Sequence, residues 1–150
     1  MLIRSISGIR GLISSHLTKE SCINFANAID QIIPDGVIML GRDTRPSGEE
    51  LLENVSTQLQ KCGRTVIVLG IVPTPTIQYM VQNTEAQGGI VITASHNPIE
   101  WNGFKFIRND GTFFRPDECL SLIHISEPTR LLSIGAARVG VQKKRGGGGG

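Results

Sequence analysis

Residues 37–63 have the sequence VIMLGRDTRPSGEELLENVSTQLQKCG, and the fold prediction starts from this stretch. The apolar run 37–40 predicts a buried strand that ends at a glycine. Ser47 and Glu50 have the spacing of a capping box, so they predict the start of a helix. Apolar residues then recur at helical spacing as far as Gly63, a residue type that commonly follows a helix. The stretch therefore predicts one strand–loop–helix unit.

The same alternation continues on both sides of this unit. The pattern predicts helices over 18–33 and 74–83, strands over 2–6, 65–69 and 89–93, a loop over 7–11, and a hairpin over 104–114 with an Asn-Asp-Gly turn. Apolar strands that alternate with helices predict an α/β protein: a three-layer α/β/α fold around a mixed, mostly parallel sheet. Ligands of such sheets bind outside the carboxyl ends of the strands.

Composition limits the class of protein. The chain has 150 residues, 39% apolar and 19% charged, which is enough for one ordinary domain with a single core. It has no apolar run of about 18 residues and no secretory signal pattern, so the sequence predicts no membrane span. The three cysteines lie far apart without CxxC spacing, which predicts reduced thiols in a cytoplasmic protein.

Charge and composition change near the end of the chain. Residues 1–118 carry 10 Lys and Arg against 12 Asp and Glu, whereas residues 119–150 carry 5 against 1. The net charge of +2 therefore comes from the tail and predicts no nucleic-acid partner. Residues 120–130, LSLIHISEPTR, resemble the translation of a sequencing adapter, and the chain ends in five glycines. We expect a domain over 1–118 and a non-native, disordered tail over 119–150.

Residues 93–98, TASHNP, follow a predicted buried strand and include groups suited to phosphoryl chemistry. The hydroxyl of Ser95 would lie at the carboxyl edge of the sheet beside His96 and Asn97, and such groups can carry or receive a phosphoryl group. A hydrolase triad is not indicated, because adjacent side chains on an extended segment point apart and no GxSxG motif occurs. Composition alone also fits an Asn-Pro turn in which Ser and His have no chemical role.

Three further segments offer charged groups. Arg10 lies between two glycines and could hold a phosphate, or could lie on an ordinary surface turn. Arg42 and Asp43 precede a helix N-terminus, which favours anions, but the favoured interpretation is that the acid and the arginines pair with each other and only shape the loop. Lys105 could act as an acid or base close to Ser95, or could protect an edge strand from aggregation.

In this order, the motifs resemble the first domain of the α-D-phosphohexomutase superfamily. The resemblance rests on SGIRG (7–11), GRDTRPSG (41–48), PTPT (73–76), GGIVITASHNP (88–98) and NGFK (102–105), and it covers about residues 2–118. The superfamily includes phosphoglucomutase, phosphomannomutase and phosphoglucosamine mutase, and the opening SISGIRG is most similar to the last of these. TASHNP within this order is highly specific, whereas each other motif alone is not.

The resemblance implies a role for several of the site residues. Ser95 would carry the phosphoryl group that moves between O1 and O6 of a hexose phosphate through a bisphosphorylated hexose. The phosphate on Ser95 would also be one ligand of Mg²⁺. Lys105 and His96 would serve catalysis, and Arg10 would bind phosphate. From the residues themselves, we expect Asn97 to help bind phosphate and Arg42 and Asp43 to shape their loop.

The sequence lacks the rest of the machinery that the resemblance implies. Other domains of the superfamily supply an Asp-rich metal loop, a sugar-recognition loop and a phosphate-binding loop, and none of these motifs occurs here. Mg²⁺ needs several oxygen ligands, which Ser95 alone does not provide. We therefore expect the chain to be inactive alone and to act with missing C-terminal domains of the same parent chain. The alternatives are a domain that binds phosphorylated ligands without transfer, and a regulatory or structural domain.

Overall fold

A computed structural model describes residues 3–4 and 8–126. The strands in these residues are β1 (Ile3–Arg4), β2 (Gly8–Leu12), β3 (Ile38–Arg42), β4 (Val66–Ile71), β5 (Gly88–Ile92) and β6 (Trp101–Arg108). The helices are α1 (Lys19–Ile32), α2 (Gly48–Lys61), α3 (Thr74–Gln82) and α4 (Pro116–Ser126). Over this part of the chain, the six strands form one sheet in the order β1-β2-β6-β5-β3-β4.

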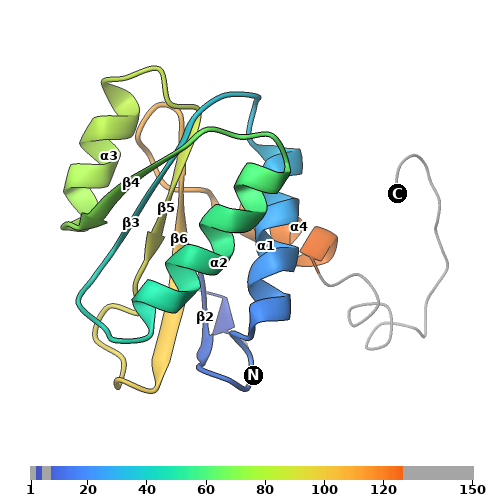
Figure 1. Ribbon diagram of the computed structural model, residues 1–150, viewed down its shortest axis with the longest axis vertical. Coiled ribbons are helices and arrows are strands. Elements are labelled where there is room, and N and C mark those ends of the chain that lie inside the picture. Colours follow the sequence, from blue (N-terminus) through green and yellow to red (C-terminus); the bar gives the residue numbers. More distant parts are fainter. Residues whose placement is uncertain (1–2, 5–7, 127–150) are drawn as a thin grey trace, which may run out of the picture.

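The sheet lies between two layers of helices (Figure 1). Helices α1, α2 and α4 cover one face, where the larger apolar cluster includes Phe25, Phe104 and Phe106. Helix α3 covers the other face, and its Ile77 and Val81 pack in a smaller cluster with residues of β3, β5 and β6. Burial of apolar side chains on both faces stabilises such a three-layer arrangement. The predicted α/β/α fold with a mixed sheet is confirmed.

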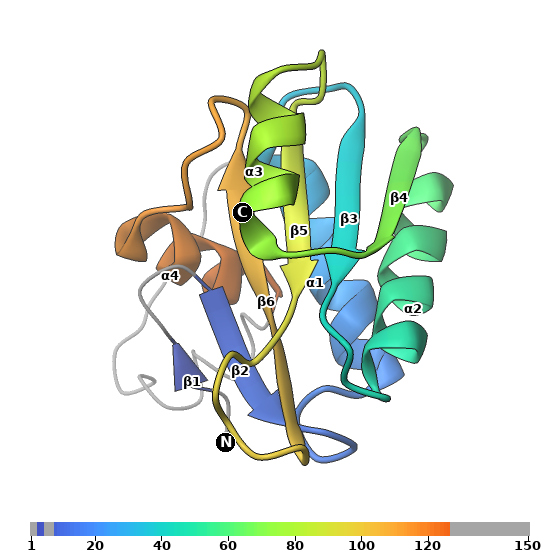
Figure 2. The same cartoon turned by 90° about the vertical axis from the view of Figure 1, so that its left-hand side faces the viewer.

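Strand direction determines which loops meet. Strand β3 pairs in parallel with β4 and β5, whereas β6 runs antiparallel between β5 and β2. Strands β2, β3, β4 and β5 therefore point the same way, and β1 and β6 point the opposite way. We call the edge where those four strands end the carboxyl edge, and the opposite edge the amino edge. Strand β6 begins at the carboxyl edge, after the loop that follows β5 (Figure 2).

Two predictions around β6 are wrong in detail. The described residues of the predicted loop 7–11 belong to strand β2, which pairs with β6 from Gly8 to Leu12. A Cβ at Gly8 would lie 2.0 Å from the carbonyl oxygen of Phe104, so this glycine permits close strand pairing, not a turn. The predicted hairpin return is reduced to a bridge between Ile107 and Phe113, because β6 finds its partners in β5 and β2 instead.

The capping box forms at α1 and not at α2. The Oγ1 of Thr18 accepts a hydrogen bond from the Ser21 amide over 3.1 Å, and the Ser21 Oγ accepts one from the Thr18 amide over 2.8 Å. Ser47, where the box was predicted, has helical dihedral angles and makes no side-chain cap. Its Oγ instead accepts a hydrogen bond from Nδ2 of the buried Asn102 over 2.9 Å. A long-range polar contact to β6 thus replaces the local one.

Helix α4 corrects the predicted domain boundary at residue 118. The helix continues to Ser126, and its Cys119 and Leu122 are fully buried in the cluster that α1 also lines. Apolar residues one turn apart are enough to bury one helix face, which explains why order continues past the change in composition. The predicted disorder from residue 127 onward falls outside the described residues, and the non-native origin of the tail stays a prediction.

Candidate active site

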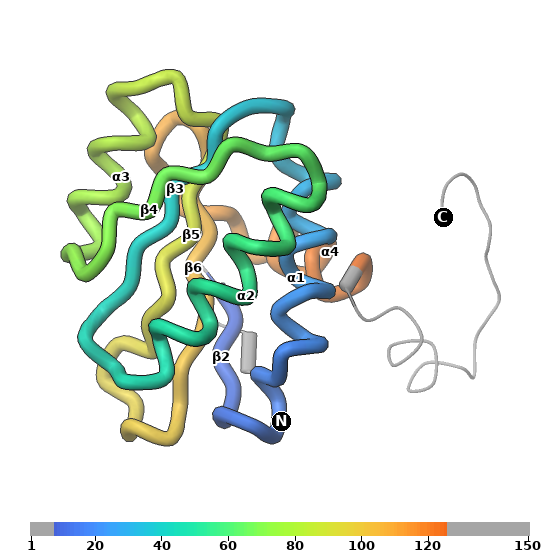
Figure 3. The backbone as a smooth tube through the Cα atoms, in the orientation of Figure 1, coloured from blue at the N-terminus to red at the C-terminus, as the bar shows by residue number. Residues whose placement is uncertain are grey.

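Two loops lie side by side at the carboxyl edge (Figure 3). One joins β3 to α2 over residues 43–47, and the other joins β5 to β6 over residues 93–100. Ser95 lies exposed in the second loop, which we call the serine loop. Its φ is +56°, a left-handed conformation that is uncommon for residues other than glycine. The Ser95 amide donates to Oγ1 of Thr93 over 3.1 Å. Ser95 is therefore exposed to solvent, and its backbone conformation is one that other interactions must stabilise.

That support comes from Arg45, a residue that the sequence analysis did not single out. Its Nη1 donates to the carbonyl oxygens of Pro98 over 2.7 Å and Trp101 over 3.0 Å. Its Nη2 donates to the carbonyl oxygens of Ser95 over 3.0 Å and Asn97 over 2.5 Å. The side chain is only 12% exposed. One guanidinium thus binds three carbonyls of the serine loop and the carbonyl of Trp101, the first residue of β6.

Asp43 joins Arg45 to the base of the serine loop. Its Oδ2 lies 3.4 Å from Nε of Arg45 and accepts a hydrogen bond from the Thr93 hydroxyl over 2.7 Å. Its Oδ1 accepts one from the Arg45 amide over 3.0 Å. Arg42 donates from Nη1 to the carbonyl oxygens of Asp43 and Arg45, both over 3.3 Å. Arg42 thus contacts only its own loop, whereas Asp43 contacts its own loop and also Thr93 of the other one.

Arg10 reaches the serine loop from β2. Its Nη1 donates to Oδ1 of Asn97 over 2.5 Å, so the predicted phosphate-binding pair lies together, two residues from Ser95. The side chain crosses Gly103 of β6: a Cβ there would lie 2.9 Å from Cγ of Arg10 and 2.3 Å from the carbonyl oxygen of Ile9. Glycine at this position leaves the room through which Arg10 passes.

Lys105 lies on the same face of the sheet as Arg10, but two residues further along β6 from the carboxyl edge than Gly103, the partner of Arg10. Arg10 pairs with Gly103 in the register of β2 and β6, and side chains two residues apart on a strand share a face. The Lys105 Nζ lies 5.5 Å from the centroid of the Phe113 ring, and no hydrogen bond or ion pair within the described residues joins it to Ser95. His96 is exposed beside the serine, and no hydrogen bond of its side chain occurs within residues 8–126.

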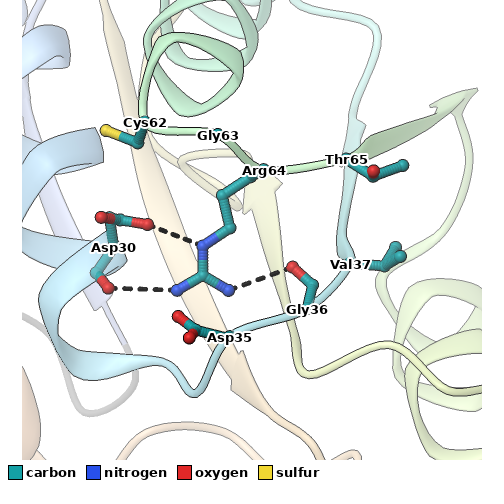
Figure 4. A pocket seen from close by; sticks show the side chains of 8 residues that line it. All are labelled: Asp30, Asp35, Gly36, Val37, Cys62, Gly63, Arg64 and Thr65. Atoms are coloured by element: carbon teal, nitrogen blue, oxygen red, sulfur yellow. Dashed lines mark hydrogen bonds and ion pairs between the residues drawn. The ribbon is translucent and has the colours of Figure 1, made fainter.

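A hollow of about 450 Å³ lies at the amino edge, where Gly36 and Val37 precede β3 and Arg64 and Thr65 precede β4 (Figure 4). Arg64 lies in it and donates from Nε to Oδ1 of Asp30 over 2.7 Å. Its terminal nitrogens donate to the carbonyl oxygens of Asp30, Ile33, Pro34 and Gly36. All five of its N–H directions thus point at protein oxygens, and this guanidinium holds the turn between α1 and β3.

The described residues do not fit a Mg²⁺ site by themselves. No group of three or more His, Cys, Asp or Glu side chains lies together in this part of the chain. Asp43, whose carboxylate contacts Thr93 at the start of the serine loop, is already engaged by Arg45 and Thr93. A phosphate on Ser95 would add oxygen ligands, but Mg²⁺ also needs carboxylates that these residues do not offer there.

Fold and site together define the class of protein: an α/β/α domain that exposes a serine at the carboxyl edge of its sheet. Residues 2–128 match the family model described as phosphoglucomutase/phosphomannomutase, alpha/beta/alpha domain I. The chain belongs to this family and contains its domain I, so the predicted superfamily is confirmed. No helix within the described residues is both long and apolar enough to cross a membrane.

Named relatives give the same result. A probable phosphoglucosamine mutase of Methanosphaera stadtmanae is 43% identical over 115 residues, 75% of this chain and 25% of that protein. The phosphoglucosamine mutase of Clostridium botulinum strain Alaska E43 is 35% identical over 108 residues, 69% of this chain and 24% of that protein. The crystal structure of a Burkholderia thailandensis phosphoglucomutase/phosphomannomutase family protein aligns with a TM-score of 0.74 at 27% identity, over 85% of this chain and 30% of that one. The chain spans about a quarter of the length of these two curated relatives.

Proposed function

We propose that this chain is the phosphoryl-carrying domain of an α-D-phosphohexomutase and that Ser95 is the carrier. The observation behind the proposal is the geometry of the serine loop. Ser95 is exposed with a left-handed φ, and the guanidinium of Arg10 donates a hydrogen bond to Asn97, two residues away. Membership of the family supports the same reading. A domain that only bound phosphate would use Arg10 but would need no exposed serine beside it.

The reaction follows from phosphoryl transfer chemistry. A sugar hydroxyl at O1 or O6 attacks the phosphorus on Ser95, the new O–P bond forms, and the P–Oγ bond breaks with its electron pair left on Oγ. Lys105 is the base that we propose for the sugar hydroxyl proton, and His96 is the group that we propose for returning a proton to Oγ. The bisphosphorylated hexose then gives its other phosphoryl group back to Ser95. The net result moves phosphate between O1 and O6.

Phosphate mapping tests the carrier. The full-length parent protein is incubated with a hexose 1,6-bisphosphate, digested and analysed by peptide mass spectrometry. We expect the peptide with Ser95 to carry one phosphoryl group, which it loses when glucosamine 6-phosphate is added, a sugar suggested by the names of the relatives. Ser95→Ala should take up no phosphate and lose nearly all activity. Phosphate on Thr93, or near-normal turnover of Ser95→Ala, would overturn the proposal.

The isolated 150-residue chain is expected to show no mutase turnover. It spans about a quarter of the two curated relatives, and its described residues form no metal-binding group. Catalysis needs both reactants held in place, which one domain with an open serine loop does not achieve. A coupled assay on the purified chain with glucosamine 1-phosphate checks this, with the parent protein as the positive control. Turnover by the chain alone would contradict the expectation.

A further inference from the structure

We propose that Arg45 is a positioning residue for phosphoryl transfer: its guanidinium fixes the backbone of the loop that presents Ser95. The inference rests on the proposed function. Its starting observation is that the four carbonyl oxygens bound by Arg45 belong to Ser95, Asn97, Pro98 and Trp101, which together span the serine loop. Arg45 itself lies 50 residues or more before them in sequence. The loop is therefore held from a different strand–helix connection.

Both sides of the Ser95 backbone are held by one network. The Ser95 amide donates to the Thr93 hydroxyl, which donates to Asp43, and Asp43 pairs with Arg45. Arg45 closes the circuit by donating to the Ser95 carbonyl oxygen. With its amide and carbonyl both bound, Ser95 keeps the left-handed φ of +56° that exposes its hydroxyl. Without the circuit, the ordinary preference of a serine for negative φ would move the hydroxyl away.

The arginine fork suits this task better than any other side chain. The guanidinium is planar and always charged, and it presents five N–H donors in a rigid arrangement. Hydrogen bonds from such a cation are stronger than those between neutral groups. Asp43 balances the charge in a site where Arg45 is only 12% exposed. A lysine at this position has one nitrogen, which cannot reach four carbonyls spread over the loop.

Arg64 provides a natural comparison at the amino edge. Like Arg45, it binds four backbone carbonyls through its terminal nitrogens and one aspartate through Nε. Figure 4 shows the contacts to Asp30 and Gly36. Its side chain is 3% exposed, so it is at least as buried as that of Arg45. The turn that Arg64 holds contains no residue of the proposed site. Removing each arginine therefore separates a general loss of stability from a specific loss of loop geometry.

The test compares Arg45→Met, Arg45→Lys and Arg64→Met in the full-length parent protein. We expect Arg45→Met to lower kcat about 10²-fold while KM for the sugar phosphate stays near the parental value, because misplacement of the serine affects the reacting atom more than ground-state binding. Arg45→Lys should recover little of this loss. Arg64→Met should leave kcat unchanged at a temperature where all variants are folded.

Hydrogen exchange followed by mass spectrometry supplies a readout independent of activity. In Arg45→Met, the amides of Asn97 and Trp101, which are bound within the loop to Ala94 and Pro98, should exchange about tenfold faster or more. Arg64→Met should leave these two amides protected. If Arg45→Met does not fold, Arg45→Lys decides the question.

The outcomes distinguish this inference from the proposed function. Normal kcat in the folded Arg45 variants, with Ser95→Ala inactive, would overturn the positioning role alone. An equal loss of kcat in Arg64→Met would also overturn it, because the loss would then reflect general destabilisation. Full activity of Ser95→Ala would overturn the proposed function, whereas unchanged exchange at Asn97 and Trp101 in Arg45→Met would show that Arg45 does not hold the loop.

Discussion

Arg10 crosses the backbone of Gly103 to reach the serine loop, and a methyl group on Gly103 would occupy the space of its side chain. The Cγ of Arg10 would lie 2.9 Å from that methyl group, and the carbonyl oxygen of Ile9 would lie 2.3 Å from it. The second contact involves backbone that is paired with β6, so it cannot relax by a change of rotamer. The absence of a side chain at Gly103 of β6 thus leaves the space that the Arg10 side chain of β2 occupies.

Gly103→Ala is therefore expected to lower both stability and substrate affinity. Overpacking should reduce the free energy of unfolding by about 1–3 kcal/mol, and the displaced Arg10 should raise KM for the sugar phosphate in the parent protein. Gly63→Ala is the matched control: Gly63 has φ of +94° with no atom within 4 Å of an added Cβ. It should cost about 1 kcal/mol through backbone strain and leave KM unchanged. Equal KM values for the two variants would contradict the prediction.

Ser95→Gly is expected to be more stable than Ser95→Ala by about 1 kcal/mol, because glycine adopts the left-handed region without the penalty that Cβ imposes. Both variants should be inactive. Ser14, with φ of +70°, offers a control outside the serine loop. Ser14→Gly should exceed Ser14→Ala in stability by a similar amount, with activity retained. Chemical denaturation of the four variants checks the sign, and a less stable Ser95→Gly would show that the loop does not keep this conformation.

Lys105→Met is expected to affect activity far more than stability. Lys105 is partly buried and lies over the Phe113 ring, an interaction worth about 0.5–1 kcal/mol at exposed sites. A methionine keeps most of the apolar stem, so the loss of stability should stay within that range. Removal of a general base should lower kcat by about 10²–10⁴. A variant with normal kcat and lowered stability would show that Lys105 only packs against Phe113.

Cys22 should make the fold sensitive to alkaline pH. Burial raises the pKa of its thiol from 9.0 to about 12, and the nearby Glu50 carboxylate adds to the rise. Above pH 9 the unfolded chain loses this proton while the folded chain keeps it, so the free energy of unfolding falls as pH rises toward 12. The loss could reach about 4 kcal/mol. Cys22→Ala should show a shallower decline over this range; parallel curves for the two proteins would contradict the prediction.

Local patterns in the sequence predicted the strands and helices that their own residues stabilise. The helix after Thr18 and the buried strand before Thr93 follow from apolar spacing and nearby caps, and both are present. The described part of 7–11 was assigned to a loop because glycines favour turns, whereas Gly8 permits close approach of β2 and β6. That pairing joins residues that are 89 to 97 positions apart in the sequence, and no local pattern reports it.

The sequence was enough to choose the residues of the candidate site, but not to predict how they lie relative to one another. The order of the motifs pointed to Ser95, Arg10 and Asn97, and the structure places these three close together. Arg45 was named only within its motif, because its role depends on carbonyl oxygens that any residue type could supply. A side chain that binds backbone leaves no signature in the sequence of its partner. The only available signal was an arginine two residues after an aspartate in a strand–helix loop.

The four carbonyls held by Arg45 also set a limit on transplanting this loop into another protein. A graft of residues 93–102 would bring the serine and its neighbours to a new scaffold but would leave behind the cation that shapes them. The smallest set of residues that can be transferred therefore has two segments, the serine loop and the connection from Asp43 to Ser47. These segments follow the adjacent parallel strands β5 and β3. Any host must supply that pair of strands in the same register before the serine can keep its pose.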